Sequence, residues 1–374
     1  MSTAFLLGVL FTATFVQLAL WLRVYAPLAL YSPNSPRSKE PLPALSVIIC
    51  ARNEAENLQR RLPAVLAQDY PDYEVIVVDD DSADDTPALL RRLAAEYPRL
   101  RALRLSPKTS PGKKAALAYG IAAAKNEWLV FTDADCTPAS SYWLREMALR
   151  MEMPSESPVE IVLGYGPYIA TAGALNRWVR FETVFTAMQY GAFAQCGLPY
   201  MGVGRNLAWK KSLFARAGGF ASHAELASGD DDLFVNAVAT AHNTALCFSP
   251  QAFMYSPAPH SWAGWFRQKR RHLSTGHRYR RRHRVALAMV AGTQVGHYGL
   301  LIWALLSGFL WTALLCWGIR LAAAYGVFAR VARRLNAGDL PRYFLLFDAL
   351  LALYWGGFVP LAWCLSVGRK TPWK

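Results

Sequence analysis

The chain has 374 residues, of which 53% are hydrophobic, and it carries a formal net charge of +14. Its mean hydropathy of +0.14 is too high for an ordinary soluble enzyme. The charged middle of the chain equally excludes a pure membrane bundle. The composition therefore predicts a globular domain attached to a membrane.

Residues 1–30 are predicted to be a membrane anchor. Residues 4–22 are nearly all apolar, which is long enough to span a bilayer. A cleaved signal peptide would need basic side chains ahead of its apolar core, and residues 1–3 have none. Arg23, Arg37 and Lys39 follow the apolar run, so the positive-inside rule places its C-terminal end in the cytoplasm. We therefore expect an uncleaved anchor in the inner membrane of the cell, with the globular domain in the cytoplasm.

Short apolar runs alternate with helical patterns in the first half of the segment 44–260, which is predicted to be the globular domain. The runs are rich in β-branched residues and are predicted strands, at 45–50, 74–78, 100–105 and 127–131. Helices are predicted at 54–68, from about 84–87, and at 111–125. This alternation predicts an α/β fold with a mostly parallel, Rossmann-like sheet that helices cover on both faces.

Polar clusters stand where three of these strands end. They are Arg52-Asn53-Glu54, Asp79-Asp80-Asp81 and Asp133-Ala134-Asp135. Ligands of parallel sheets bind beyond the carboxyl ends of the strands. Two carboxylates separated by one small residue can hold a divalent cation together with nucleotide phosphates, so Asp133 and Asp135 are candidate metal ligands. Lys113 and Lys114 open a helix against its dipole, which favours a phosphate-facing role for at least one of them.

The acids at 79–81 have a second interpretation. They can form a turn that caps the following helix, for which Ser82, Asp84 and Asp85 are also suitable. Three adjacent acids repel one another, however, and no basic residue lies near them in the sequence. We therefore expect a cation or a hydrogen-bonded ligand to compensate their charge.

The second half of the domain is less regular. We expect a strand and turn over 164–168, a helix over 174–193 and a glycine-containing loop over 201–209 that leads into a strand. The loop glycines allow a close approach of the backbone to a ligand, with a plain tight turn as the alternative. Asp230-Asp231-Asp232 follow a glycine and open a helix over 233–240. Capping accounts for one of these acids, which leaves another available as a general base.

Residues 261–284 are predicted to be a basic segment at the membrane interface. Nine Arg and Lys residues and no acid lie between Arg267 and Arg284, directly after Trp262, Trp265 and Phe266. A nucleic-acid-binding arm would have a similar charge. Basic residues that follow aromatics and precede an apolar stretch instead favour anionic lipid headgroups or a diphosphate. We therefore expect no nucleic-acid partner.

The remaining segment, 285–374, is predicted to supply two or three membrane-spanning helices. The apolar stretch 285–328 is either a hairpin of two spans or one long helix followed by an interfacial one, and the arginines between 330 and 342 favour the hairpin. Arg320 must then snorkel or face a polar groove. A last span over 343–367 is expected to turn Asp348 toward other helices. The six cysteines are scattered without C-x-x-C pairs, so reduced thiols are expected rather than disulfides or a zinc site.

From about Ser46 to Gly276 the chain resembles the family 2 glycosyltransferases, which are inverting enzymes with the GT-A fold. Motifs of this family occur here in the family's order, and the resemblance is greatest to membrane-bound bacterial members. The motifs are residues 46–54, the acidic segment 78–86, Asp133-Ala134-Asp135, Gly204-Arg205-Asn206, Asp230-Asp231-Asp232-Leu233 and Gln268-Lys269-Arg270-Arg271-His272. Three positions differ from the family pattern: Asp81 stands for a glycine, Gly229 for a glutamate and His272 for a tryptophan. Because the tryptophan is missing, the resemblance does not imply processive synthesis.

The resemblance implies a role for each motif. The nucleotide-sugar-binding residues would be Ala51, Asn53, Glu54, Asp79, Asp80, Lys113, Asp133, Gln268 and Arg271. Asp133 and Asp135 would hold Mg²⁺ or Mn²⁺, while Asn206 and Asp231 would lie on the acceptor side. Asp230 would be the catalytic base, with Asp231 as the alternative.

The implied reaction is a single displacement with inversion. Asp230 would take the proton of an acceptor hydroxyl as it attacks the anomeric carbon of a nucleotide diphosphate sugar, expected to be a UDP-sugar. The partners would be this donor, a lipid-linked or polysaccharide acceptor, and the membrane. A membrane-anchored nucleotidyltransferase is the first alternative, although no glycine-rich phosphate loop follows the first strand. A non-catalytic nucleotide-sugar sensor is the second, although the candidate base is intact.

Overall fold

The computed structural model describes residues 2–31, 42–108, 112–153 and 157–366, and it contains two compact units. The sheet unit comprises the chain from the linker after Tyr31 to Thr171, together with Gly197–His260. The helical unit comprises the chain up to Tyr31, Ala172–Cys196, and the chain from Ser261 onward. Arg37 and Lys39, on which the expected orientation of the anchor partly depends, lie outside the described residues, as do the expected start of one helix at residue 111 and the end of the last span at residue 367.

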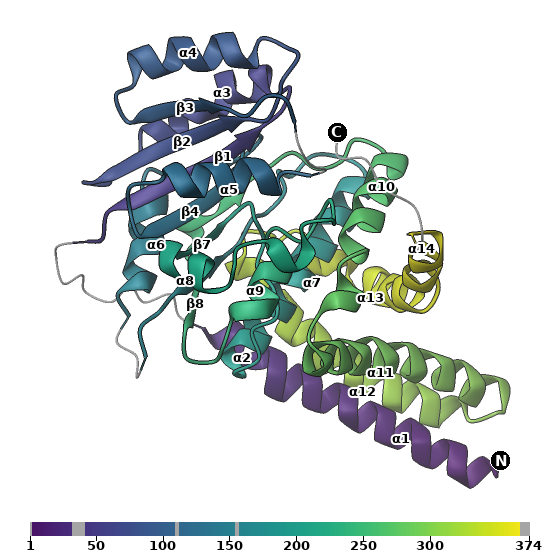
Figure 1. Cartoon of the computed structure of the whole chain (residues 1–374). Helices are drawn as coiled ribbons and strands as arrows, with labels where there is room; N and C mark the ends of the chain where they lie inside the picture. The colour runs from purple at the N-terminus through teal and green to yellow at the C-terminus, as the bar shows by residue number, and fades with distance from the viewer. Residues whose placement is uncertain (1, 32–41, 109–111, 154–156, 367–374) are drawn as a thin grey trace. The chain divides into compact units, whose positions relative to one another are not determined.

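The sheet unit is built on a seven-stranded sheet with the strand order β3-β2-β1-β4-β7-β6-β8 (Figure 1). The strands are β1 Leu45–Ala51, β2 Tyr73–Asp79, β3 Leu100–Arg104, β4 Trp128–Asp133, β6 Ile161–Gly164, β7 Leu207–Lys210 and β8 Thr244–Cys247. The first four strands are mutually parallel, as the sequence predicts. β7 is antiparallel to both β4 and β6, and β6 is parallel to β8. A two-stranded sheet joins β5 Thr137–Pro138 to β9 Met254–Tyr255.

Helices cover both faces of the parallel strands, so strand side chains that point to either face are buried. The helices of this unit are α3 Ala55–Leu66, α4 Thr86–Glu96, α5 Lys114–Ala123, α6 Trp143–Met151, α8 Lys211–Arg216 and α9 Asp232–Val238. Val47 and Ile49 pack in one hydrophobic core with residues of α3, α4 and α6. On the opposite face α5 lies close to β1 and β2, and a Cβ at Gly120 would come within 3.0 Å of Ile48 and Val78. The predicted two-sided α/β layering is therefore confirmed.

The second half of the sheet differs from the sequence prediction. The strand expected over 164–168 runs instead from Ile161 to Gly164, and the chain leaves the sheet where the prediction begins it. Gly164 is packed so tightly that a Cβ would lie 2.5 Å from Cγ of Asn206. The sequence pattern missed this strand because it has only four residues, all of them buried, so it shows no alternation of polar and apolar side chains.

Within its described residues, the helical unit contains four helices that are long and apolar enough to cross a membrane. They cover Thr3–Leu30, Arg281–Leu306, Leu310–Arg334 and Pro341–Ala362. In the first, α1 Thr3–Ala19 passes through a π-helical turn, Leu20–Tyr25, into α2 Ala26–Leu30. α11 Arg281–Leu306 and α12 Leu310–Arg334 form the predicted hairpin, and both lie beside α1 (Figure 1). The last candidate span contains α13 Phe344–Leu353, a π-helical segment Tyr354–Phe358 and the start of α14 Val359–Ser366.

Two further helices of this unit have more polar sequences than the candidate spans. α7 Ala174–Gln195 matches the helix predicted over 174–193, and it groups with the helical unit rather than with the sheet. α10 Trp262–Leu273 is capped by Ser261, whose Oγ accepts a hydrogen bond from the backbone N–H of Gly264 at 3.1 Å. It carries the Gln268 to His272 motif.

A buried polar cluster joins the four candidate spans at one point. Arg320 of α12 forms an ion pair with Asp348 of α13, and both side chains are at most 1% exposed. Gln17 of the first helix accepts hydrogen bonds from Arg320 at 3.2 and 3.3 Å. From α11, Gln294 Nε2 and the Tyr298 hydroxyl donate to the Asp348 carboxylate at 3.1 and 2.6 Å. Arg320 therefore faces polar partners inside the bundle, and Asp348 faces other helices as expected.

We predict that breaking this cluster from one side destabilises the bundle. Arg320→Leu leaves the Asp348 carboxylate buried without its cation, which should lower the free energy of unfolding by about 3–5 kcal/mol. The double variant Arg320→Leu/Asp348→Leu removes both charges and should recover most of this loss. Denaturation in detergent micelles measures both effects. Arg330→Leu, an exposed arginine of the same helix, is the matched control, and an equal loss in the control would contradict the prediction.

Candidate active site

The parallel register brings the strand-end clusters to one edge of the sheet. Ala51 at the end of β1 lies opposite Asp79 at the end of β2. Cys50 on the other side of β1 lies opposite Asp133 at the end of β4. The three clusters that the sequence places after β1, β2 and β4 therefore converge at a single edge, as expected for parallel strands.

The acids at 79–81 are held by the protein itself. Asp79 is 1% exposed, and its Oδ1 accepts the backbone N–H of Ser82 at 3.0 Å. Its Oδ2 lies 3.5 Å from Nε of Arg104 at the end of β3. Asp80 is fully buried and forms an ion pair with Lys108. The expectation that no basic residue compensates these acids is thus wrong, because the third strand and its loop supply two cations that are distant in sequence.

Asp81 occupies its position because it tolerates a left-handed backbone. Its φ is +61°, a conformation that glycine adopts freely and that aspartate and asparagine adopt more readily than other residues. The Asp81 carboxylate accepts a hydrogen bond from the Ser106 hydroxyl at 2.7 Å. This bond lowers the pKa of the Asp81 carboxyl below its usual range, with the backbone N–H of Lys108 adding to the effect. The aspartate therefore substitutes for the glycine of the family pattern.

The loop after β1 is fixed against the loop after β2. Asn53 has a φ of +54°, donates its backbone N–H to the Ser82 hydroxyl at 2.9 Å and accepts the N–H of Ala83 on its side-chain oxygen at 2.8 Å. The backbone N–H of Glu54 is donated to the hydroxyl of Thr86 at 3.0 Å. Asn53 and Glu54 consequently lie at the same edge as Asp79 and Asp80.

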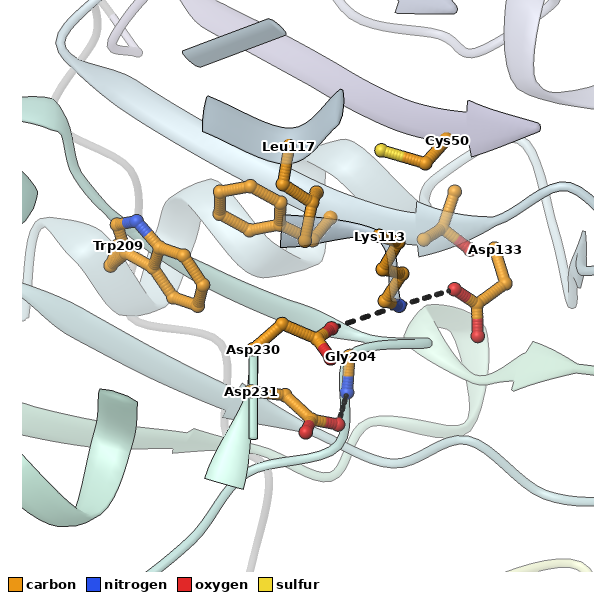
Figure 2. A pocket seen from close by; sticks show the side chains of 10 residues that line it. Cys50, Lys113, Leu117, Asp133, Gly204, Trp209, Asp230 and Asp231 are labelled. Atoms are coloured by element: carbon orange, nitrogen blue, oxygen red, sulfur yellow. Dashed lines mark hydrogen bonds and ion pairs between the residues drawn. The ribbon is translucent and has the colours of Figure 1, made fainter. Parts of the chain in front are cut away.

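Lys113 joins the metal motif to the candidate base (Figure 2). Its Nζ lies 2.9 Å from Oδ1 of Asp133 and 3.1 Å from Oδ2 of Asp230. Asp231 is held beside them, since its Oδ2 accepts the backbone N–H of Gly204 at 2.7 Å. These residues line one pocket. Asp230 thereby contacts the ammonium group of a lysine that lies about 120 positions earlier in the sequence.

Charge and burial oppose each other in this pocket. Burial alone would lower the pKa of Lys113, but the carboxylates of Asp133, Asp230 and Asp231 outweigh it and raise the pKa well above its ordinary value. Lys113 is therefore a permanent cation. Burial raises the pKa of Asp231 to about 7, with the neighbouring charges of Asp230 and Asp232 adding to the effect. At neutral pH Asp231 accordingly lies near the midpoint between its neutral and ionised forms.

The adjacent Lys114 has a structural role. Its side chain is buried, and Nζ donates to the backbone oxygens of His223, Leu226 and Ser228, each at 2.7 Å. Those carbonyls belong to the loop that leads into Asp230. Of the two lysines for which a phosphate-facing role is favoured, only Lys113 therefore points into the pocket.

Asp133, Asp135 and Cys136 each offer an atom that could hold a metal, and these atoms lie within 4.8 Å of one another. Burial raises the pKa of the Cys136 thiol well above its ordinary value, with Asp135 adding to the effect, and sulfur is in any case a softer ligand than Mg²⁺ or Mn²⁺ prefers. The two carboxylates remain, and such oxygens suit Mg²⁺ or Mn²⁺ when phosphates and water complete the coordination. The residues at this position therefore fit the expected metal.

The side chain of Asn206 is hydrogen-bonded inside the sheet unit. It is fully buried, its Oδ1 accepts Nε1 of Trp143 at 3.0 Å, and its Nδ2 donates to the oxygens of Tyr165 and Ala252 at 2.9 and 2.7 Å. All polar atoms of the amide are thus bonded within the sheet unit. This placement differs from the expected acceptor contact, because the side chain instead ties the loop after β6 to the loop before β7.

Gln268 and Arg271 belong to the helical unit, three residues apart on α10 and therefore on one face of that helix. The pocket around Lys113 is formed by the sheet unit alone.

The sequence prediction missed Arg104, Lys108 and Arg205. Arg104 ends the third strand and Lys108 lies in the loop after it, so a search of that strand end would have found both. Arg205 lies over the ring of Tyr168 at 4.1 Å and donates to the Ser256 hydroxyl at 2.8 Å, contacts that no sequence pattern indicates.

Comparisons with known proteins match both units. A family model described as glycosyl transferase family group 2 matches residues 128–365, and one described as glycosyl transferase family 2 matches residues 46–201. A probable glycosyltransferase of Bacillus subtilis, YdaM, is 27% identical over 253 residues, which cover 64% of this chain and 58% of that protein. The beta-monoglucosyldiacylglycerol synthase of Trichormus variabilis is 34% identical over 110 residues, which cover 29% of this chain and 24% of the relative. The chain thus matches only part of the length of these relatives.

A solved structure of similar fold is a mannosyltransferase from Pyrobaculum calidifontis in complex with GDP-Man and Mn²⁺. It superposes with a TM-score of 0.57 and 21% identity, covering 93% of this chain and 99% of that one. This likeness confirms the predicted fold, a mostly parallel GT-A sheet with additional apolar helices.

We predict that Asp231 makes stability depend on pH. Its folded-state pKa of about 7 lies above the ordinary carboxyl value, so the folded protein holds a proton that the unfolded chain has released. Stability should therefore fall as pH rises from about 4 to about 7. Asp231→Asn removes this effect, and its stability relative to the wild type should rise by about 2–3 kcal/mol between pH 5 and pH 8.

Unfolding in detergent with the divalent metal removed by a chelator measures this difference at each pH. Asp72→Asn, on the exposed surface, is the control and should show no such trend. A pH-independent difference between Asp231→Asn and the wild type would contradict the assigned protonation of Asp231.

Proposed function

The chain belongs to family 2 of the glycosyltransferases, and from this we propose that it transfers a sugar from a nucleotide diphosphate sugar to an acceptor hydroxyl, with inversion at the anomeric carbon. The observation that carries the proposal is the Lys113 ammonium, which holds the metal-motif carboxylate of Asp133 and the candidate base Asp230 at one edge of the sheet. A transferase needs a site for the leaving diphosphate next to a proton acceptor, and this arrangement supports both roles.

The donor side is formed by the edge of β1, β2 and β4. Asp79 Oδ2 and Asp80 Oδ1 are buried without a hydrogen-bond donor among the described residues, so a ligand N–H or hydroxyl could supply one. Asn53 and Glu54 lie beside them, which supports binding of the base and ribose here. Asp133 and Asp135 would hold Mg²⁺ or Mn²⁺, and the ion, when bound, would neutralise charge on the leaving diphosphate. Arg271, on α10, is proposed as a second cation for that diphosphate.

Asp230 is proposed as the base that accepts the acceptor's proton. The Lys113 contact orients one of its carboxylate oxygens, and Lys114 fixes the loop that carries it. The new bond forms between the acceptor oxygen and the anomeric carbon, while the bond from that carbon to the diphosphate oxygen breaks. The proton passes to Asp230 and the electron pair leaves with the nucleoside diphosphate.

A UDP-sugar is the proposed donor and a lipid-linked or polysaccharide hydroxyl the proposed acceptor. The four apolar helices support an acceptor near the membrane. The name of one relative, a beta-monoglucosyldiacylglycerol synthase, is consistent with a lipid acceptor. We propose a multi-pass protein of the inner membrane whose sheet unit lies in the cytoplasm.

We predict that Asp230→Asn abolishes transfer but leaves nucleotide binding largely intact. The amide cannot accept the proton, so turnover should fall by about 10²-fold or more. Release of nucleoside diphosphate from a panel of sugar donors by the detergent-solubilised protein measures turnover, and calorimetry with UDP or GDP measures binding. Asp231→Asn is the matched control on the neighbouring residue. An active Asp230→Asn protein together with an inactive Asp231→Asn protein would move the base to Asp231.

We also predict that Asp135→Asn weakens the metal-dependent part of nucleotide binding. Removing one of two carboxylate charges lowers the affinity for a hard divalent cation. The affinity for UDP or GDP should therefore fall in the presence of Mn²⁺ and stay unchanged in its absence. If the variant kept the metal dependence of the wild type, the metal role of Asp135 would be wrong.

A further inference from the structure

α10 is docked through one face onto a buried carboxylate of α7. Trp265 and Lys269 are four residues apart and therefore lie on the same side of the helix. Nζ of Lys269 lies 2.6 Å from Oε1 of Glu182, and Nε1 of Trp265 donates to Oε2 of Glu182 at 3.1 Å. Both oxygens of one carboxylate thus bind the same face of α10.

Glu182 depends on these contacts in turn. Its side chain is only 8% exposed, and that of Lys269 is 16% exposed. A carboxylate removed from water is costly unless donors replace the lost hydration, and here a cation and an indole N–H do so. The hydroxyl of Tyr354 also hydrogen-bonds to Glu182. Shifting or turning α10 would leave this buried charge without its cation, so the pair fixes the orientation of α10 on its axis.

The third partner links α10 to the last candidate span. Tyr354 opens the π-helical segment Tyr354–Phe358. Trp265 lies against Tyr354 and Phe358, with ring centroids 6.1 and 5.1 Å apart, and Phe266 lies 5.4 Å from Phe358. A π-helical segment inside an α-helix often marks a functional position. Here it presents two aromatic rings to α10 from within the apolar helix.

The neighbouring face of α10 carries Gln268 and Arg271, which are proposed to bind the nucleotide-sugar donor. Gln268 and Arg271 are three residues apart. With about 100° of rotation per residue, this pair points about 110° around the helix axis from the pair Trp265 and Lys269. Arg271 forms no ion pair with any residue that the structure describes. The side of α10 bound to Glu182 therefore sets where this cation points.

We propose that Glu182 is a positioning residue, which orients α10 so that Arg271 meets the leaving diphosphate. The inference rests on the proposed function, because it assumes that Arg271 binds the diphosphate. Glu182 does not touch the substrate in this scheme. Through Tyr354 and Trp265 it couples the position of the last candidate span to the orientation of Arg271.

The test compares Glu182→Gln, Arg271→Ala and the double variant. The amide keeps the shape of Glu182 but loses the charge that holds Lys269, so the kcat/KM for the donor should fall about 10- to 100-fold through misplacement of Arg271. Because Glu182 acts through Arg271, the double variant should be no worse than Arg271→Ala alone. Glu182→Asp keeps the charge and should recover part of the activity.

The matched control is Arg180→Gln on the same helix. Arg180 is similarly buried and forms a two-bond ion pair with Asp339 at 2.7 and 2.6 Å, away from α10. Its loss should lower the thermal midpoint at least as much as Glu182→Gln and leave kcat/KM of the folded protein unchanged. If the two variants reduced kcat/KM equally, or if the losses of Glu182→Gln and Arg271→Ala multiplied in the double variant, the role of Glu182 would be structural only.

Calorimetry with UDP or GDP and Mn²⁺ separates this inference from the proposed function. A wild type that binds nucleoside diphosphate but releases none from any sugar donor would overturn the transferase activity alone. The inference would then still be supported by equal weakening of binding in Glu182→Gln and Arg271→Ala. Weakening in Arg271→Ala without weakening in Glu182→Gln would overturn the inference alone, and no binding by the wild type would overturn both.

Discussion

The pocket depends on one ammonium group that is shared among carboxylates. Lys113 lies between Asp133 and Asp230, and without its charge these carboxylates and Asp231 would repel one another at close range. Its neighbour Lys114 points elsewhere and ties down the loop that carries Asp230. The first turn of one helix thereby sets both the electrostatics of the pocket and the position of the candidate base.

The sheet decides which segments meet this ammonium group. Parallel β1, β2 and β4 end at the same edge, which gathers the donor-side acids. β7 then pairs antiparallel with β4, so the loop ahead of β7 lies at that same edge. Gly204 in this loop donates its backbone N–H to Asp231, and a Cβ at Gly204 would lie 3.1 Å from Oδ2 of Asp231. A glycine is therefore well suited to this close approach.

The helical unit uses the same principle in apolar surroundings. Arg320 with Asp348, and Lys269 with Glu182, are ion pairs around a buried carboxylate, and the partners in each pair come from different helices. A hydrophobic helix surface can slide or rotate against another at little cost, whereas a buried charge has one favourable partner. Such pairs consequently fix how the helices are rotated and aligned, which the apolar contacts alone leave less well defined.

The sequence by itself determined the parallel half of the sheet, the two-sided helix packing, the hairpin of α11 and α12, and the acids that gather at the strand ends. These follow from local periodicity and from the rule that parallel strands share an edge. Only the tertiary structure decided that Arg104 and Lys108 neutralise the acids at 79–81, that Asn206 is buried, and that Lys113 rather than Lys114 enters the pocket. Each of these depends on contacts between residues far apart in the chain or on the direction of one side chain at a helix start. Hydrophobic periodicity carries information about which face of an element is buried, but it carries none about which charges become neighbours once those faces have packed.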